Sequence, residues 1–224
     1  MATIEGLKGF RTLGAAERAA VAAVTRELRV PKGSTVFREG QSADALWAVK
    51  EGIIHIIKSA SEGREIVLEV IAPGELFGAV VALEDRPYPA AAVAAEPSVV
   101  WRLPAPLARD LCQKHPTLRA AILAQVTARL RSAHEQLRSV ALEPVAQRLA
   151  RTLLKLADKI GHEKQGVTVV SITRRELADM VGTTVETAIR VTRQWERTGI
   201  VRSSRHELGL IDPGALGRVA QGEQ

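Results

Sequence analysis

The sequence predicts an α+β protein with an N-terminal β-roll, a long dimerisation helix and a C-terminal winged helix-turn-helix domain. Turn residues recur at short intervals between Val30 and about Leu103, and short strands with regular turns are typical of a sandwich or barrel. After Pro104 these turns stop and helical patterns follow. Near the C-terminus two helix starts flank a glycine, which is the pattern of a helix-turn-helix. The expected domains are residues 1–115, 116–142 and 143–224.

The composition is that of a folded and mildly basic chain. Apolar residues make up 46% of the 224 residues and charged residues 25%, which is ordinary for a globular protein and unlike a disordered one. The 31 Lys and Arg against 25 Asp and Glu leave a formal net charge of +6, which weakly favours a polyanionic partner. Aromatic residues are only 3%, too few for the base-stacking platform of a single-strand or RNA binder.

Several kinds of protein and of site are excluded by what the sequence lacks. No run approaches about eighteen consecutive apolar residues, so we expect neither a membrane span nor a membrane partner. Residues 1–6 have neither the basic nor the apolar region of a secretory signal, so a cytoplasmic location is expected. The single cysteine, Cys112, excludes an intramolecular disulfide framework, a cysteine-rich zinc site and a four-cysteine iron–sulfur cluster.

The roll is predicted from short apolar runs between turns. A short amphipathic helix, Ala15 to Leu28, comes before it, and a second short helix, Pro104 to His115, comes after it. The expected strands are Thr35–Phe37, Leu46–Val49, Ile53–Ile57 and Ile66–Ile71. The turns that separate them are Pro31-Lys32-Gly33, Glu39-Gly40, Glu51-Gly52, Glu62-Gly63, Pro73-Gly74 and Gly78.

A long helix is expected to begin at Pro116, because proline is favoured at the first helical position. Its apolar residues alternate at spacings of three and four, which is the a/d pattern of a two-helix dimer seam. These residues are Leu123, Val126, Leu130, Ala133, Leu137 and Val140. The alternative is a helix that packs the same stripe on its own domain, but the regular alternation favours the dimer. Glu143-Pro144 interrupts the pattern and predicts a hinge.

The last part of the chain is predicted to be the winged helix-turn-helix. It is expected to begin with a helix from Val145 to Ile160 that ends at Gly161, followed by a polar loop His162–Gly166 and a strand Val167–Ile172. A helix then runs from a capping box at Thr173–Glu176 to Val181, and after a turn at Gly182 a second helix runs from Thr183–Glu186 to Gly199. The expected wing strands are Ile200–Arg202 and Leu208–Ile211. The glycine between the two closely spaced helices carries this prediction.

The second of these helices carries side chains suited to reading DNA. Glu186 and Arg190 lie four residues apart on one face, where a carboxylate can accept from cytosine N4 and an arginine can bind guanine O6 and N7. The alternatives are an exposed ion pair, or a capping box in which Glu186 pairs with Thr183. Arg193 and Arg174 are candidates for phosphate contacts. The expected DNA-binding residues are Thr184, Val185, Glu186, Thr187, Ile189, Arg190, Arg193 and Arg174.

Several motifs carry a resemblance to a known family. They are Phe37-Arg38-Glu39-Gly40, Lys50-Glu51-Gly52, Glu62-Gly63-Arg64-Glu65, Pro73-Gly74-Glu75-Leu76-Phe77-Gly78 and Val181-Gly182-Thr183-Thr184-Val185-Glu186-Thr187-Ala188-Ile189-Arg190. On these motifs the chain resembles the CRP/FNR superfamily of transcription factors over nearly its whole length. The resemblance implies a cyclic-nucleotide-binding-like jelly roll and places Glu186 and Arg190 at the two base-reading positions.

The resemblance also implies a function and its partners. Val185 followed by Glu186 is similar to the FNR-like branch, whereas the cyclic-AMP receptor branch has arginine at position 185. The resemblance therefore implies a bacterial homodimeric regulator and not an enzyme. This regulator would bind double-stranded DNA at palindromic TTGA-like sites and contact RNA polymerase. Ile189 stands where that branch usually has serine, which leaves the outer bases open. Activation and repression are both open.

The effector is not identified by the sequence. Cyclic-AMP receptors hold the ribose and phosphate with a glutamate after the equivalent of Gly78 and with an Arg-Ser pair. This chain has Ala79 and Pro89-Ala90 there, and an anionic phosphate buried without a cation is costly. Cyclic AMP is therefore not expected, although Arg86 could substitute, and the lone cysteine excludes an FNR-type cluster. The expected effector region comprises Gly78, Ala79, Val80, Arg86, Pro89, Ala90 and His134.

Other interpretations of what the roll senses stay open. The segment Glu84–Ala90 resembles branches of the family that include nitric-oxide regulators, so a haem-based gas sensor is one alternative. A redox regulator that uses Cys112 and a regulator without any effector are two further alternatives. The candidate haem ligands are His55, His115 and His134. A cupin-type enzyme would need two or three histidines inside the roll, where only His55 lies. A sensor-only regulatory subunit would need neither a reading helix nor a wing.

Overall fold

The computed structural model describes residues 7, 13–59 and 65–223. The expected turn at Glu62-Gly63 and residues 1–6 lie outside the described residues. The chain divides into two compact units, Met1–Arg131 and Ser132–Gln224. Among the described residues, no helix combines the length and the apolar character needed to cross a membrane.

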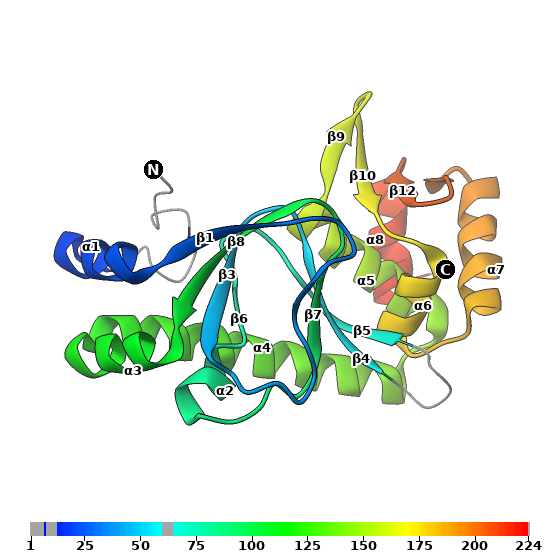
Figure 1. The fold of residues 1–224 in the computed structure, drawn as a ribbon. Helices are drawn as coiled ribbons and strands as arrows, with labels where there is room; N and C mark the ends of the chain where they lie inside the picture. The colour runs from blue at the N-terminus through cyan, green and yellow to red at the C-terminus, as the bar shows by residue number, and fades with distance from the viewer. Residues whose placement is uncertain (1–6, 8–12, 60–64, 224) are drawn as a thin grey trace. The chain divides into compact units, whose positions relative to one another are not determined.

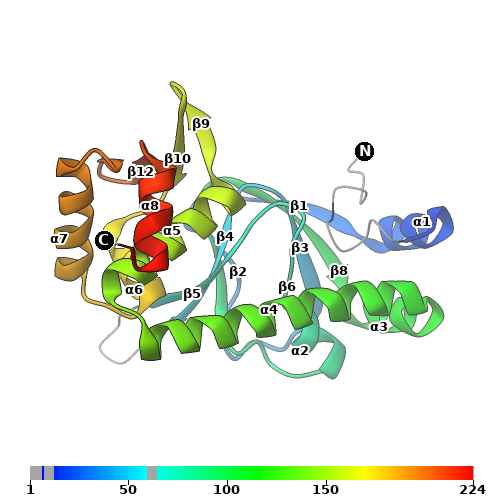
Figure 2. The ribbon, with the colours of Figure 1, turned by 180° about the vertical axis from the view of Figure 1, so that it is seen from behind.

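The first unit is a roll of two antiparallel four-stranded sheets (Figures 1 and 2), with strand orders β1-β8-β3-β6 and β2-β7-β4-β5. Its strands are β1 Arg26–Val30, β2 Thr35–Phe37, β3 Ala45–Glu51, β4 Ile54–Ser59, β5 Glu65–Ile71, β6 Leu76–Phe77, β7 Ala91–Ala94 and β8 Ser98–Pro104. Gly52 shows why a turn here needs glycine: its φ is 80° and a Cβ would lie 2.4 Å from Ser98 Oγ. The predicted N-terminal β-roll is confirmed, and its strands pair antiparallel.

The helix that precedes the roll is shorter than expected. Helix α1 spans Ala15–Val24, and the next residues form strand β1 instead of a further helical turn. Strand β1 pairs with β8 from Arg26 opposite Arg102 to Val30 opposite Ser98. The prediction of a helix as far as Leu28 is wrong, because pairing with a strand some seventy residues away overrides the local helical spacing.

Four aromatic side chains form the centre of the roll core. Tyr88 stacks on Phe37 with ring centroids 3.7 Å apart, and Trp47 and Phe77 complete the cluster. The Tyr88 hydroxyl accepts from Trp47 Nε1 at 3.0 Å and donates to the Ala45 carbonyl at 2.5 Å, so this buried polar group is satisfied. Burial raises the pKa of the Tyr88 hydroxyl, which keeps it a neutral donor.

Three further helices accompany the roll. They are α2 Ala79–Glu84, α3 Ala105–Lys114 and α4 Pro116–Leu142. The expected helix starts near Pro104 and at Pro116 are confirmed, whereas the sequence did not predict α2. Leu118 and Ile122 of α4 are buried in the roll core, and the residues of α4 from Ser132 onward belong to the second unit.

The second unit combines the end of α4 and four further helices with a four-stranded antiparallel sheet of the order β11-β12-β10-β9 (Figure 1). Its elements are α5 Val145–Ile160, β9 His162–Lys164, β10 Val167–Ser171, α6 Arg174–Val181, α7 Val185–Arg197, β11 Val201–Ser203, β12 Glu207–Leu210 and α8 Pro213–Gln221. The prediction of a polar loop over residues 162–166 is wrong in its first part, because β9 pairs with β10. Gln165 and Gly166 both have positive φ, 53° and 76°, as a two-residue hairpin turn requires.

Candidate functional site

Two helices of the second unit meet at a glycine turn. Thr173 caps α6 by accepting from the Glu176 amide, while the Glu176 carboxylate accepts from the Thr173 amide at 2.8 Å. Gly182 ends α6 in the left-handed conformation, with φ 66°. Thr184 then caps α7, because its Oγ1 accepts from the Thr187 amide at 3.2 Å. The predicted helix, glycine turn and helix are confirmed.

Helix α7 buries one face and exposes the other. Its buried residues are Ala188, Val191, Thr192 and Trp195. Glu186, Arg190 and Arg193 are exposed on the opposite side, and we call these three residues the reading face. Helix α7 lies at the outer edge of its unit, with α5, α6 and α8 all on one side of it (Figures 1 and 2). The remaining residues predicted to contact DNA on this helix are exposed or half-buried: Thr184, Val185, Thr187 and Ile189.

The alternative local role of Glu186 is wrong. A capping box with Thr183 requires the helix to begin one residue earlier than it does. Thr184 is the N-cap, so Thr187 occupies the third helical position and Glu186 the second. Glu186 lies in the first turn, where a negative charge is favoured by the helix dipole, and its side chain is exposed to a ligand.

Arg174 lies at the junction of α6 and the wing formed by β11 and β12. Its guanidinium donates to the main-chain oxygen of Ser204. Burial lowers the pKa of Arg174, and nearby Glu196 acts in the opposite direction. The structure thus gives Arg174 a contact that fixes the wing against α6, and its contact with a DNA phosphate stays a prediction.

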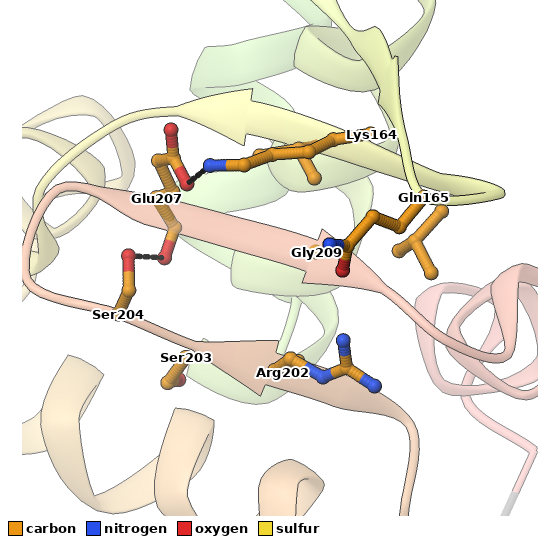
Figure 3. A pocket seen from close by; sticks show the side chains of 9 residues that line it. Lys164, Gln165, Arg202, Ser203, Ser204, Glu207 and Gly209 are labelled. Carbon is orange, nitrogen blue, oxygen red and sulfur yellow. Dashed lines mark hydrogen bonds and ion pairs between the residues drawn. The ribbon is translucent and has the colours of Figure 1, made fainter.

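A hollow of 210 Å³ lies over the sheet beside the wing (Figure 3). Gly209 keeps it open, because a Cβ at this position would come within 3.2 Å of Val167 Cγ1. Lys164 Nζ and Glu207 Oε2 form an ion pair of 2.9 Å across it, and Arg202 lies on the neighbouring strand. No sequence motif indicated this hollow, since it depends on the pairing of the four strands β9 to β12.

The expected seam residues of α4 are placed unequally. Leu123, Leu130 and Leu137, each seven residues from the next, have exposed fractions of 62%, 55% and 69%. Val140 and Ala133 are also exposed, whereas Val126 packs partly against the core of the roll. A single chain therefore leaves an apolar stripe uncovered on α4, and its use as a dimer seam stays a prediction.

Comparisons with known proteins match both units. Residues 27–115 match the model of the cyclic nucleotide-binding domain, and residues 147–219 match the model of the Crp-like helix-turn-helix domain. The cyclic AMP receptor protein of Thermus thermophilus is 30% identical over 193 residues, which cover 86% of this chain and 87% of that protein. The chain belongs to the CRP/FNR superfamily of transcriptional regulators.

Further relatives agree with this assignment. A CRP-like cAMP-activated global transcriptional regulator of Mycobacterium tuberculosis is 27% identical over 210 residues, covering 92% of this chain and 94% of that protein. A solved CRP/FNR-family transcriptional regulator of Thermus thermophilus has a TM-score of 0.77 at 25% identity, covering 89% and 100% of the two chains. The relatives are transcriptional regulators and not enzymes, and the helix-turn-helix domain that residues 147–219 match is a DNA-binding domain.

In this CRP/FNR regulator the break between α4 and α5 falls where Glu143-Pro144 predicts it, and charged side chains bridge it. Glu143 Oε1 accepts from Arg138 at 3.2 Å and from Arg151 at 2.6 Å, and its Oε2 accepts from Ser139 Oγ. Arg148 donates to the Val140 carbonyl at 2.9 Å. The end of α4 is thus tied to α5 within the second unit, and movement at this hinge stays a prediction.

These contacts predict a pH dependence of stability. Hydrogen bonds from Ser139 and Arg151 lower the pKa of Glu143 below its ordinary value of 4.5, against the opposing effect of burial. A lowered pKa means that the stabilisation is present above pH 4.5 and is lost as the pH falls through the folded-state value. We expect Glu143→Gln to lower the free energy of unfolding by about 1–3 kcal/mol at pH 7. Below pH 4.5 the difference in unfolding free energy between variant and wild type should become smaller, and urea unfolding measures both values.

Glu163→Gln is the matched control, because Glu163 is exposed on β9 of the same unit. It should change unfolding little at either pH. Equal stability of Glu143→Gln and wild type at pH 7 would contradict the assigned role of Glu143.

The predicted effector region lies mainly around α2 in the first unit. Ala79 and Ala90 are buried, whereas Val80, Arg86 and Pro89 are exposed. Of these five residues only Arg86 carries a positive charge that could neutralise a phosphate. Gly78 begins α2 with φ 65°, and a Cβ there would lie 2.8 Å from Tyr88 Cε1. His134 is exposed and belongs to the second unit. The use of these residues by an effector stays a prediction.

The structure adds polar residues to this region that the sequence did not indicate. Lys58 of β4 donates to the Pro89 carbonyl at 3.1 Å and pairs with Glu39 at 3.2 Å. Arg129 of α4 pairs with Glu69 of β5 at 2.9 Å. Both pairs join residues far apart in the sequence, so no local motif could have revealed them.

The residues considered for haem and redox sensing lie on different elements. His55 is half-buried on β4, and His115 follows α3 with its Nδ1 3.5 Å from Glu17 Oε1. Within the described residues, no three His, Cys, Asp or Glu side chains cluster as metal ligands do. Cys112 is buried, and burial raises the pKa of its thiol, which disfavours the reactive thiolate.

Proposed function

We propose that this CRP/FNR regulator is a homodimer that reads a palindromic TTGA-like site in double-stranded DNA. The observation that carries the proposal is the reading face of α7, where Glu186 and Arg190 are exposed one turn apart on a helix anchored by its buried face. A carboxylate and a guanidinium in this arrangement suit a cytosine and a guanine in the major groove. Arg193 and Arg174 would hold the phosphates.

The apolar stripe of α4 supports the homodimer. Paired α4 helices would cover Leu123, Leu130 and Leu137, which a single chain leaves exposed. The functional parts would then be the sensor roll, residues 1–115, the dimerisation helix, residues 116–142, and the DNA-binding domain, residues 143–224. A signal at the roll would modulate DNA binding, and the bound dimer would act on RNA polymerase in the cytoplasm.

Fluorescence anisotropy with labelled duplexes tests this proposal. Purified full-length protein is titrated into a duplex with two TTGA-type half-sites whose centres lie about 34 Å apart. A duplex of equal length and scrambled half-sites is the control. We expect at least about 1000-fold tighter binding to the palindrome than to the scrambled duplex, as is typical of specific sites. Equal affinity for the two duplexes would contradict the TTGA assignment.

Cyclic AMP is not expected to be the signal, although two relatives are named for it. Ala79, Pro89 and Ala90 provide no charge to hold its phosphate. We expect calorimetric titration of the full-length protein with cyclic AMP to give no binding at micromolar concentrations. A micromolar dissociation constant that Arg86→Ala abolishes would contradict this and would identify Arg86 as the phosphate ligand.

A further inference from the structure

Two side chains of α4 hold a single residue of the roll. Gln125 Oε1 accepts from the Leu76 amide at 3.2 Å, and Arg129, one helical turn later, donates to the Leu76 carbonyl. Leu76 begins the short strand β6, which ends directly before Gly78 and helix α2. Helix α4 is therefore attached at the strand that leads into the predicted effector region.

Arg129 has a second partner within the roll. Its Nε lies 2.9 Å from Glu69 Oε1 on β5, and about a third of each side chain is exposed, 32% and 35%. The guanidinium is thus shared between a carboxylate and a main-chain oxygen. An anionic ligand arriving beside Arg129 would have to displace Glu69 or be repelled by it.

The neighbouring amide of Gln125 is only half used. Its Nε2 is buried and has no hydrogen-bond partner in the described part of the chain, while its Oε1 is engaged by Leu76. The free donor can bind an uncharged acceptor such as a carbonyl oxygen. The charged group of this cluster is satisfied internally, and the neutral amide is not.

We propose that Glu69 is a built-in anion for Arg129, which holds α4 on the roll without an anionic effector and excludes anionic effectors from this part of the roll. The proposal rests on the proposed function, in which α4 links the roll to the DNA-binding domain. It assigns the basal state of the regulator to an internal ion pair and predicts that removal of this carboxylate makes the protein responsive to anions.

Hydrogen–deuterium exchange of the full-length protein tests the attachment without DNA. Glu69→Gln keeps an oxygen for the Arg129 hydrogen bond and removes the charge. We expect exchange in peptides covering Leu118–Leu130 to rise about two- to fivefold, as the loss of a partly exposed ion pair predicts. Glu27→Gln is the matched control, because Glu27 pairs with Lys50 over the same 2.9 Å at similar exposure but away from α4. Unchanged exchange in a folded Glu69→Gln protein would overturn the proposal.

The response to anions is tested in the same proteins. Wild type, Glu69→Gln and Glu69→Gln/Arg129→Gln are titrated with inorganic phosphate and with cyclic AMP, and exchange of the same peptides is followed. We expect either anion to restore protection saturably in Glu69→Gln only, since the double variant lacks the cation. Saturable protection of wild type, or no response in Glu69→Gln, would overturn the exclusion of anions by Glu69.

A DNA titration separates this proposal from the proposed function. Glu69→Gln should bind the TTGA-type palindrome about two- to fivefold more weakly than wild type, and phosphate should restore its affinity. Should wild type itself fail to prefer the palindrome, the proposed DNA site is wrong while the exchange result still decides the role of Glu69. Equal DNA affinity of the two proteins together with altered exchange would overturn the link between α4 attachment and DNA binding.

Discussion

Replacing Leu130 by glutamate is expected to convert the protein to monomers and to abolish tight DNA binding. Leu130 lies between Leu123 and Leu137 in the exposed stripe of α4, so a dimer would bring the two copies of residue 130 together. Burial of one leucine contributes about 1.5–3 kcal/mol, and two are lost, so the dimer should weaken at least about 100-fold. Two facing carboxylates add repulsion and desolvation. Sedimentation velocity at micromolar concentration measures the change.

Ala128→Glu is the matched control, because Ala128 is exposed on α4 at the position opposite the stripe. It adds the same charge to the same helix and should leave the dimer intact. Thermal unfolding should show both variants folded, since neither residue is buried in the single chain. A Leu130→Glu protein that sediments as wild type does would place the subunit interface on another surface.

The parts of the fold that sequence predicts well depend on neighbours in the chain. The capping box at Thr173–Glu176, the turn at Gly182 and the start of α4 at Pro116 each require residues only a few positions apart. The reading face follows from the same helical spacing once α7 is recognised. The role of Glu186 depends on whether Thr183 or Thr184 caps α7, a difference of one residue. Only the structure, in which Thr184 is the cap, determines which role applies.

The parts that sequence does not predict depend on pairing over long distances. Residues 26–28 continue a helical pattern but pair with β8, and the exposed residues of β9 pair only because β10 lies beside them. Glu69 and Arg129 are sixty residues apart, so neither suggests the other. The sequence indicates an effector region around the missing phosphate clamp at Ala79, whereas charged groups near it come from distant elements, among them Lys58 of β4 and Arg129 of α4.

Arg190 is expected to carry the largest share of sequence discrimination. Its side chain is exposed in the second turn of α7, one turn after Glu186, where it can reach a guanine edge. One bidentate contact is worth about 1–3 kcal/mol, and a dimer makes it twice, so Arg190→Ala should weaken binding to the palindrome about 30-fold or more. Binding to the scrambled duplex should change far less, and preference at the G·C pair should flatten. Anisotropy against a panel of single base-pair substitutions measures both effects.

Arg193→Ala supplies the comparison, because Arg193 is an exposed arginine on the same face, one turn later. As a phosphate contact it should weaken all duplexes alike and reduce the salt slope by about one per lost contact. Glu186→Ala should relax discrimination more than it lowers affinity, since a carboxylate near phosphates is unfavourable wherever it reads no base. If Arg190→Ala instead weakens binding to all duplexes alike and reduces the salt slope, Arg190 is a phosphate ligand. Base discrimination must then come from Glu186 or from DNA shape.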